Sequence, residues 1–305
     1  MAYRIVEITK PAECHVINSQ LEITLEEGTV NIPLEDIEII LCIGAKIRFS
    51  TMGLGELNKA GIVVVGFGKT HIPETLIEPY FPNQRHSSLL KKQIFWADDF
   101  KNQLWNKIIR QKIDNSSRNL AVLGLDGVKE IEGFIQQVQD GDKENIEAQA
   151  ASAYFQFYHK GLNRRTDDPV NSALNYGYAI IRSYIIKALI STGFHCALGI
   201  NHHNEYNNFN LADDLIEPWR AMVDQIAYEI IGTDCNLSIK QRRALTGVLH
   251  KPCKIDGKID GKIMNISTGI ELMVDSFKNS VVENQAELLK LPMLIYFKES
   301  IPCES

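Results

Sequence analysis

The residues whose types and spacing could do chemistry gather first in residues 199–220. Two neighbouring histidines, His202 and His203, lie in an asparagine-rich segment, and the acids Asp214 and Glu217 follow them. Positions three apart project to the same side of a helix, so the carboxylates of Asp214 and Glu217 are expected to face one cation. The plainer alternatives are two ordinary loop histidines and acids that only stabilise the positive end of a helix.

A second acid, Glu147, precedes a run of small residues, and Tyr154 returns to the same helical face seven positions later. Small residues let another helix or a ligand approach closely. A glutamate in this tight and largely apolar setting is expected to pair with a base or to coordinate a metal, because burying a lone carboxylate is costly. The alternative is an exposed helix glutamate.

One imidazole and two carboxylates form a ligand set that suits Mn²⁺ and permits Mg²⁺ with retained waters. Such an ion keeps coordination positions open for phosphate. In phosphodiester chemistry it neutralises the non-bridging oxygens and activates a water or a 3′-hydroxyl. The sequence therefore predicts Mg²⁺ or Mn²⁺ as the cofactor.

The first ~75 residues predict a β-rich unit, because short runs alternate between apolar and polar residues or are rich in β-branched residues. The predicted strands cover residues 3–9, 15–18, 21–25, 29–33, 38–41 and 62–65, and a helix covers 51–60. We expect a small, mostly antiparallel sheet.

From about residue 87 the apolar period changes to that of helices. The predicted helices cover residues 87–114, 127–139, 143–159, 169–192, 211–231, 238–249 and 265–285. Asp168 followed by Pro169 is a strong start signal. We predict an α+β protein with a β-rich N-terminal domain (1–80), a linker (81–90) and a larger all-α catalytic domain (91–305).

Composition is that of a folded globular protein, with 45% hydrophobic and 23% charged residues. No stretch approaches the roughly 20 apolar residues that a membrane span needs, and no secretory signal pattern opens the chain, so a cytoplasmic protein is expected. The six cysteines are scattered without metal-binding or disulfide spacing, which predicts free thiols. The net charge of −6 by itself argues against nucleic-acid binding.

Three blocks in this order resemble the CRISPR-associated Cas-one family of spacer-acquisition integrases. The blocks are Glu147, Ala150, Ala151 and Tyr154-Phe155; Asp168-Pro169-Val170-Asn171 with Tyr176-Gly177-Tyr178; and Gly199, His202 and Asp214-Leu215-Ile216-Glu217-Pro218-Trp219-Arg220. The resemblance covers the chain from its start to about residue 250. The asparagine-rich loop and the chain length are most like the versions found in type II systems.

The resemblance implies that Glu147, His202 and Glu217 are the catalytic metal ligands. It implies His202 rather than His203, because His202 stands three positions after Gly199, as the family's motif histidine does. Asp214, Tyr154 and Asn171 are then expected to support the site. The chain departs from the family pattern at Ser152, where a basic residue is frequent.

The family's activity is that of a metal-dependent DNA endonuclease and integrase, which inserts short DNA fragments into a CRISPR array. A fragment's 3′-hydroxyl attacks a phosphodiester at the repeat boundary. The implied partners are DNA, a second copy of the chain in a homodimer, and a small second CRISPR-associated adaptation protein that bridges two dimers.

Basic residues on one face of such an assembly would let an acidic chain bind DNA, since repulsion is screened beyond roughly 8–10 Å at cellular salt. The candidates for contact with the DNA backbone are Arg85, Lys91, Lys92, Arg164, Arg165, Arg242 and Arg243. Three other functions compete with integration. They are a stand-alone metal-dependent nuclease, a non-catalytic DNA-binding scaffold and a hydrolase of small phosphoesters.

Overall fold

The computed structural model describes residues 4–68, 73–78, 86–162, 164, 166, 168–230, 235, 237–255 and 262–295. The chain forms two compact units, residues 1–86 with 190–193 and residues 87–189 with 194–305. Helix α2 begins at His86, inside the predicted linker. Residues 79–85 lie outside the described part, so the predicted domain boundary stays a prediction.

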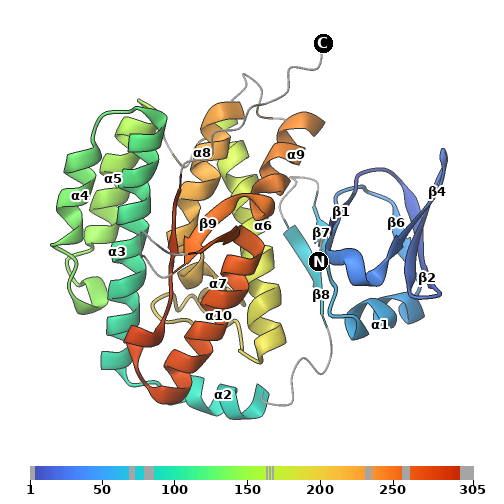
Figure 1. The fold of residues 1–305 in the computed structure, drawn as a ribbon, viewed down its shortest axis with the longest axis horizontal. Coiled ribbons are helices and arrows are strands. Elements are labelled where there is room, and N and C mark those ends of the chain that lie inside the picture. Colours follow the sequence, from blue (N-terminus) through green and yellow to red (C-terminus); the bar gives the residue numbers. More distant parts are fainter. Residues whose placement is uncertain are drawn as a thin grey trace. The chain divides into compact units, whose positions relative to one another are not determined.

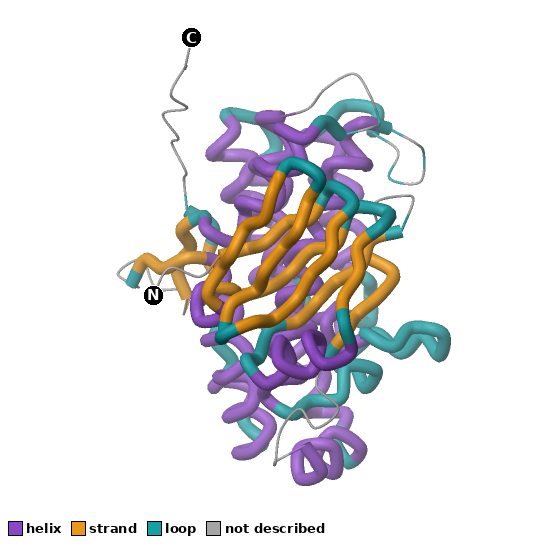
Figure 2. The backbone as a smooth tube through the Cα atoms, turned by 90° about the vertical axis from the view of Figure 1, so that its right-hand side faces the viewer, coloured by secondary structure: helices purple, strands orange, loops and turns teal. Residues whose placement is uncertain are grey.

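In its described residues the first unit holds two four-stranded sheets, the helix α1 and a short 3₁₀ turn (Figures 1 and 2). Its elements are β1 (Arg4–Ile8), β2 (Ala12–Ile17), β3 (Gln20–Leu25), β4 (Gly28–Pro33), β5 (Ile37–Cys42), β6 (Ile47–Phe49), α1 (Thr51–Lys59), β7 (Val63–Phe67) and β8 (Pro73–Ile77). The sheet orders are β1-β5-β7-β8 and β4-β3-β2-β6. Leu21, Ile40 and Leu57 are fully buried in the core that these elements share.

The prediction of a mostly antiparallel sheet is wrong in detail, because both sheets are mixed. Strands β2–β3, β3–β4 and β7–β8 pair antiparallel, whereas β1–β5, β5–β7 and β2–β6 pair parallel. Helix α1 is the crossover that lets β7 return parallel to β5. Apolar alternation predicts that a strand forms but carries no information on its direction. The short strand β6 and strand β8 were not predicted.

The second unit is mainly helical (Figure 1). Its α-helices in chain order are α2 (His86–Ile94), α3 (Asp98–Leu123), α4 (Val128–Ile135), α5 (Ile146–Tyr158), α6 (Pro169–Thr192), α7 (Asn210–Leu215), α8 (Arg220–Ile230), α9 (Ile239–Thr246) and α10 (Ile266–Glu283). The bounds of α6 are those predicted, and Asp168 Oδ1 accepts a hydrogen bond from the Val170 N–H at 2.7 Å. The predicted α+β class, β-rich first and helical afterwards, is confirmed.

Two predicted helices are each divided in the structure. Residues 95–97 separate α2 from α3, and the acids Asp98 and Asp99 favour a new helix start there. The predicted helix 211–231 is α7, a 3₁₀ turn (Glu217–Trp219) and α8. Pro218 explains this second break, since proline has no N–H to donate inside an α-helix.

The C-terminal unit is not wholly helical, which corrects the all-α prediction. Strands β9 (Pro252–Ile255), β10 (Ile263–Asn265) and β11 (Pro292–Met293) form a small antiparallel sheet in the order β10-β9-β11. Each strand has only two to four residues, which is too short for a clear period of two.

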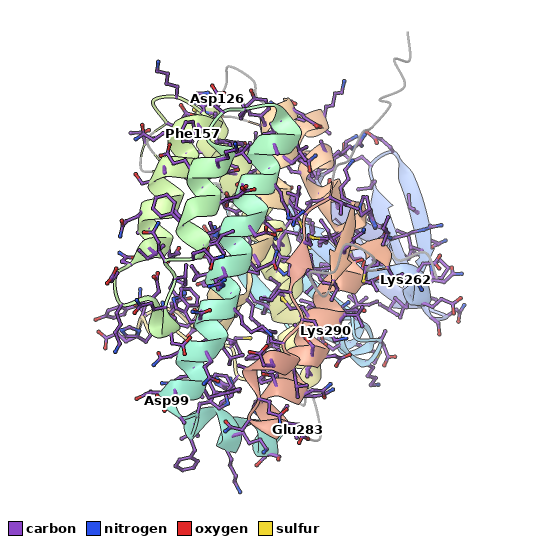
Figure 3. All side chains as sticks on the ribbon, turned by 60° about the vertical axis from the view of Figure 1, so that its left-hand side comes forward. Asp99, Asp126, Phe157, Lys262, Glu283 and Lys290 are labelled. Atoms are coloured by element: carbon purple, nitrogen blue, oxygen red, sulfur yellow. The ribbon has the colours of Figure 1, made fainter. Side chains whose placement is uncertain are left out.

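Helix α3 carries one wall of the site and runs from near Asp99 toward Asp126 (Figure 3). Its buried Asn115 donates hydrogen bonds to the backbone oxygens of Pro218 at 2.7 Å and Pro292 at 2.9 Å. Helices α6 and α8 approach closely at Gly177, where an added Cβ would lie 2.3 Å from Val223 Cγ1. These contacts fix the segment that contains Glu217.

Two expectations from composition can be compared with the described residues. None of the described helices is long and apolar enough to cross a membrane. The described cysteines, Cys14, Cys42, Cys196, Cys235 and Cys253, are free thiols. Cys303 lies outside the described residues.

Candidate active site

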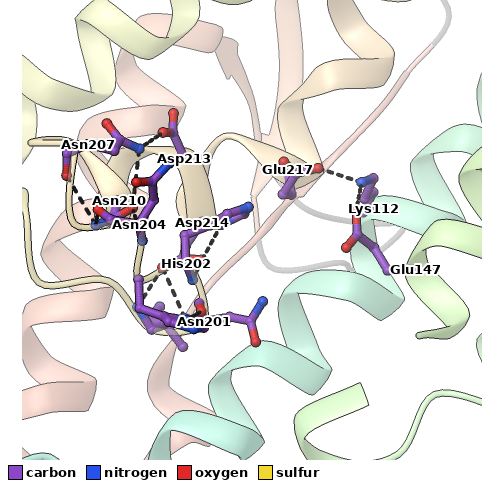
Figure 4. A network of polar contacts seen from close by, with 12 residues as sticks. Lys112, Glu147, Asn201, His202, Asn204, Asn207, Asn210, Asp213, Asp214 and Glu217 are labelled. Carbon is purple, nitrogen blue, oxygen red and sulfur yellow. Dashed lines mark hydrogen bonds and ion pairs between the residues drawn. The ribbon is translucent and has the colours of Figure 1, made fainter. Parts of the chain in front are cut away.

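Glu147 and Glu217 converge on one partly buried ammonium group, that of Lys112 (Figure 4). Glu147 lies in the first turn of α5, Glu217 begins the 3₁₀ turn after α7, and Lys112 lies in the middle of α3. Nζ of Lys112 is 2.5 Å from Oε2 of Glu217 and donates a hydrogen bond to Oε1 of Glu147. The two predicted carboxylates therefore share a cation.

The position of Glu147 depends on how α5 begins. Both oxygens of Asp142 accept hydrogen bonds from the first turn, Oδ1 from the Ile146 N–H at 2.9 Å and Oδ2 from the Glu147 N–H at 3.0 Å. Satisfying these otherwise unpaired donors stabilises the helix start. Asp142 thereby fixes the residue that carries the carboxylate.

Glu217 is held ionised by its basic neighbours. Arg220 donates to Oε1 from Nε at 3.0 Å and from Nη2 at 2.9 Å, which leaves Oε2 facing Lys112. Burial alone would raise the pKa of Glu217, but Arg220 and Lys112 lower it to about 2. Burial likewise opposes the charge of Lys112, but Glu217 and Glu147 raise the pKa of its ammonium.

His202 is oriented by Asp214, not by the glutamates. Nδ1 of His202 lies 2.7 Å from Oδ1 of Asp214, and this hydrogen bond raises the pKa of His202 against the effect of burial. Asp214 is fully buried and also accepts from the backbone N–H groups of Ile200 (2.5 Å), Asn201 (3.2 Å) and His202 (3.0 Å). Since Asp214 is occupied in this way, it supports the histidine. In neutral His202, a proton on Nδ1 leaves the lone pair on Nε2.

Glycine is required at position 199 by this arrangement. A Cβ there would lie 2.2 Å from the His202 carbonyl oxygen and 2.8 Å from Oδ2 of Asp214. His203 is exposed, and its Nδ1 bonds to the backbone oxygen of Asn201 at 2.8 Å. Of the two histidines, only His202 is hydrogen-bonded to the buried carboxylate of Asp214.

The three predicted ligands do not form one closed cluster. Across the described residues, no group of three or more His, Cys, Asp and Glu side chains is placed to hold a metal ion. Glu147 and Glu217 meet, whereas His202 lies in the neighbouring loop (Figure 4), where Glu217 contributes to raising its pKa. The chemistry of the donors fits Mg²⁺ or Mn²⁺, because two carboxylates already face one positive charge and the adjacent loop supplies an imidazole.

Tyr154 and Asn171 contact other residues of the site. The hydroxyl of Tyr154 accepts from Asn119 at 2.7 Å and donates to Oδ2 of Asp224 at 2.9 Å. Asn171 accepts a hydrogen bond from Arg164, whose guanidinium lies over the ring of Tyr178 at 5.7 Å. Tyr154 therefore forms part of the buried side of the site, and Asn171 positions the guanidinium of Arg164.

A cavity of about 230 Å³ opens beside the two glutamates. Its wall carries both acidic and basic side chains, namely Lys112, Glu147, Arg164, Glu217, Arg220 and Asp224. Such a mixed lining suits a charged ligand whose phosphate is attracted by arginines while the acids attract a cation.

Three residues of the site, Lys112, Arg220 and Asp224, are not among the site residues that the sequence predicted. Arg220 had a readable signal, because it stands three positions after Glu217 on a helical path. Asp224 stands seven positions after Glu217 and recurs on the same face. Nothing in the sequence distinguishes Lys112 from the other basic residues of α3.

The candidate DNA contacts have different environments. Lys91 and Arg243 are exposed, and Arg243 lines a groove with Lys240 and His250. Three others bond within the chain, Lys92 to the Val282 oxygen at 3.2 Å, Arg242 to the Leu237 oxygen at 2.5 Å, and Arg164 to Asn171. Arg85 and Arg165 lie outside the described residues.

Comparisons with known proteins agree on one family. The family model described as CRISPR associated protein Cas1 matches residues 6–237. The CRISPR-associated endonuclease Cas1 of Neisseria meningitidis serogroup C (strain 8013) is 32% identical over 306 residues, which cover 98% of this chain and 99% of that protein. The CRISPR-associated endonuclease Cas1 2 of Pyrobaculum aerophilum is 27% identical and covers 76% of this chain and 85% of its own length.

Solved structures share the fold at low sequence identity. A Cas1 protein from Thermotoga maritima superposes with a TM-score of 0.71 at 14% identity, covering 97% of this chain and 100% of the other. A casposase bound to integration product gives a TM-score of 0.74 at 20% identity, with coverage of 93% and 91%. The predicted family is confirmed, and this chain belongs to the Cas1 family of CRISPR-associated endonucleases and integrases.

Proposed function

We propose that this protein joins short DNA fragments to a CRISPR array with the help of Mg²⁺ or Mn²⁺ held by Glu147, His202 and Glu217. The observation that carries the proposal is the convergence of Glu147 and Glu217, from separate elements, on one cation beside a cavity lined with arginines. The bound ion would neutralise the phosphate and activate a 3′-hydroxyl or a water.

The protein's own residues have distinct roles in this proposal. Arg220 occupies one oxygen of Glu217 and keeps the carboxylate ionised, so that the other oxygen remains a ligand. Asp214 holds Nδ1 of His202 and directs Nε2 to act as the third ligand, as buried carboxylates do behind metal-binding histidines. Arg164 and Arg220 would attract the phosphate at the cavity wall.

The neighbours' names support DNA and a second protein as partners. Structures with this fold include a casposase bound to integration product, a Cas6-RT-Cas1–Cas2 complex (TM-score 0.72) and a Cas1–DNA complex (TM-score 0.56). We therefore propose that this chain acts as a homodimer and binds DNA through exposed basic residues such as Lys91 and Arg243. We also propose that it forms a complex with a small second adaptation protein.

A DNA-joining assay tests the ligand set. Purified protein with the small partner, a repeat-containing supercoiled plasmid, a short duplex and Mn²⁺ or Mg²⁺ would be run for wild type, Glu217→Gln, His202→Ala and His203→Ala. We expect loss of joined product for Glu217→Gln and His202→Ala, loss of all activity in EDTA, and retention for His203→Ala. Loss in His203→Ala alone would identify the other histidine as the ligand.

The same assay separates the competing functions. A stand-alone nuclease would give nicked plasmid without joined fragments, although it would depend on the same residues. A DNA-binding scaffold would leave Glu217→Gln indistinguishable from wild type. Turnover of a small phosphoester in the absence of DNA joining would indicate a hydrolase instead.

A further inference from the structure

Lys112 occupies the position between the two carboxylates that the proposed function gives to a divalent ion. Its side chain is only 14% exposed, and those of Glu147 and Glu217 are 26% and 4% exposed. Its ammonium is 2.5 Å from Oε2 of Glu217 and hydrogen-bonded to Oε1 of Glu147. These oxygens face one positive charge, and the lysine supplies it.

An ion and the ammonium cannot share this position. A Mg²⁺ ion binds oxygen at roughly 2.0–2.1 Å, so an ion on these two oxygens would fall within a few ångströms of Nζ. Like charges at about that separation repel strongly in a partly buried site. The lysine must therefore withdraw before both carboxylates can coordinate an ion.

We propose that Lys112 is a built-in competitor for the divalent ion, occupying the site between Glu147 and Glu217 until the ion displaces it. The proposal rests on the proposed function insofar as these glutamates are the ligands. It assigns to Lys112 a role that the ligands themselves do not have: it sets how tightly the ion binds and keeps the site folded without one.

The neighbouring Arg220 is a poor candidate for the same displacement. Its guanidinium makes two hydrogen bonds to the other oxygen of Glu217 and lies over the Tyr178 ring at 4.6 Å. The planar guanidinium of Arg220 is therefore held by Glu217 and by Tyr178, whereas the ammonium of Lys112 is carried by a flexible four-carbon chain. The adjoining cavity of about 230 Å³, which Lys112 itself lines, gives the displaced ammonium room.

Charge balance explains why a competitor is useful. Without an ion, Lys112 and Arg220 offset the two carboxylates, so the site does not depend on metal for folding. Removing one partner of a buried ion pair is destabilising, because the other charge is left uncompensated. A variant without the ammonium should therefore bind the ion more tightly and gain more stability from it.

The test is Mn²⁺ binding to the full chain in the absence of DNA, measured by isothermal titration calorimetry and by the melting temperature with Mn²⁺ or EDTA. For Lys112→Met we expect the dissociation constant for Mn²⁺ to fall about 10- to 100-fold, because the ion pairs of Lys112 with Glu147 and Glu217 no longer need to be broken. The melting temperature in EDTA should fall, and the rise on adding Mn²⁺ should exceed that of wild type. Lys101→Met, on the same helix and paired only with exposed Asp98 in the described structure, is the matched control.

Lys112→Gln provides a second variant if Lys112→Met is too unstable to titrate in EDTA, because an amide still donates to the carboxylates without the charge. Equal or weaker Mn²⁺ binding in the variant that folds would overturn the competitor role. Glu217→Gln distinguishes the two proposals. If it abolishes Mn²⁺ binding while the Lys112 variants bind no tighter, the metal site stands and the competitor fails. If it leaves Mn²⁺ binding unchanged, both proposals fail.

Discussion

The candidate site has two halves that are built in different ways (Figure 4). In the loop half, Asp214 collects hydrogen bonds from residues 12 to 14 positions away. In the helix half, Lys112 joins Glu147, which is 35 positions away, and Glu217 from a third element. The loop half is held by local hydrogen bonds, whereas the helix half exists only through the packing of α3 with α5 and the 3₁₀ turn.

Because of this difference, mutations in the two halves should affect stability and activity differently. Asp214 is fully buried and its oxygens are used by backbone donors, so its removal leaves polar groups unsatisfied in the interior. Glu147 is 26% exposed and faces a flexible ammonium. We expect changes in the loop half to reduce stability and activity together, and changes at Glu147 to reduce activity alone.

The largest expected effect is the loss of DNA joining in Glu147→Gln. An amide cannot supply the negative charge that a metal ligand needs, so the rate should fall about 10²- to 10³-fold, as when one electrostatic contact to a transition state is removed. The free energy of unfolding should change by less than about 1 kcal/mol, because the carboxylate is partly exposed. Rates come from the joining assay and stability from urea unfolding.

Glu144→Gln is the control for that change, since Glu144 is exposed just before α5. It should retain wild-type activity. A Glu147→Gln variant that joins DNA at the wild-type rate would remove Glu147 from the ligand set.

The second effect is the destabilisation of Asp214→Ala. Three backbone N–H groups and the His202 ring lose their acceptor, so the free energy of unfolding should fall by at least about 3 kcal/mol. Chemical denaturation followed by helical circular dichroism measures it. Glu205→Ala, an exposed change in the same loop, should differ little from wild type. An Asp214→Ala variant as stable as wild type would contradict the claim that the loop half depends on Asp214 for its stability.

The third effect concerns the wall behind the helix half and depends on pH. Burial raises the pKa of Asp224 to about 6 from its ordinary 3.8, against the hydrogen bonds from Tyr178 and Tyr154 and the charges of Arg164 and Arg220. The folded state therefore binds this proton more tightly than the unfolded state. The contribution of Asp224 to stability is greatest below about pH 4 and declines as the pH rises to about 6.

Asp224→Asn removes this titration. The unfolding free energy of wild type minus that of Asp224→Asn should decrease by roughly 2–3 kcal/mol between about pH 4 and pH 6 and then level off. Denaturant unfolding at several pH values gives this difference. A difference that stays constant, or that rises with pH, would show that the carboxyl ionises normally.

The smallest effect leaves both halves intact. Arg243→Ala should reduce the slope of log affinity against log salt for DNA binding by about one unit, since one phosphate contact is lost. Fluorescence anisotropy with a labelled duplex measures the slope. Lys278→Ala removes a basic side chain that forms an ion pair with Asp275 on α10, and it should leave the slope unchanged. The same slope in Arg243→Ala and wild type removes Arg243 from the contact surface.

The sequence by itself determined the features that depend on neighbouring residues. Apolar alternation or β-branched enrichment located β1 to β5, a fully apolar run located β7, the Asp168-Pro169 signal located the start of α6, and the family motifs selected Glu147, His202 and Glu217 as candidates. Hydrogen-bonding preference and periodicity act over a few positions, so they can be read from a short stretch of chain.

The tertiary structure alone decided which distant side chains meet. It brought Lys112 between the two glutamates, gathered Tyr154 and Tyr178 on Asp224, made half of the N-terminal strand pairings parallel and closed a small sheet from β9 to β11. These outcomes depend on how whole elements pack and in which direction they return. No local pattern encodes that choice, because the same helix or strand signal is compatible with many neighbours.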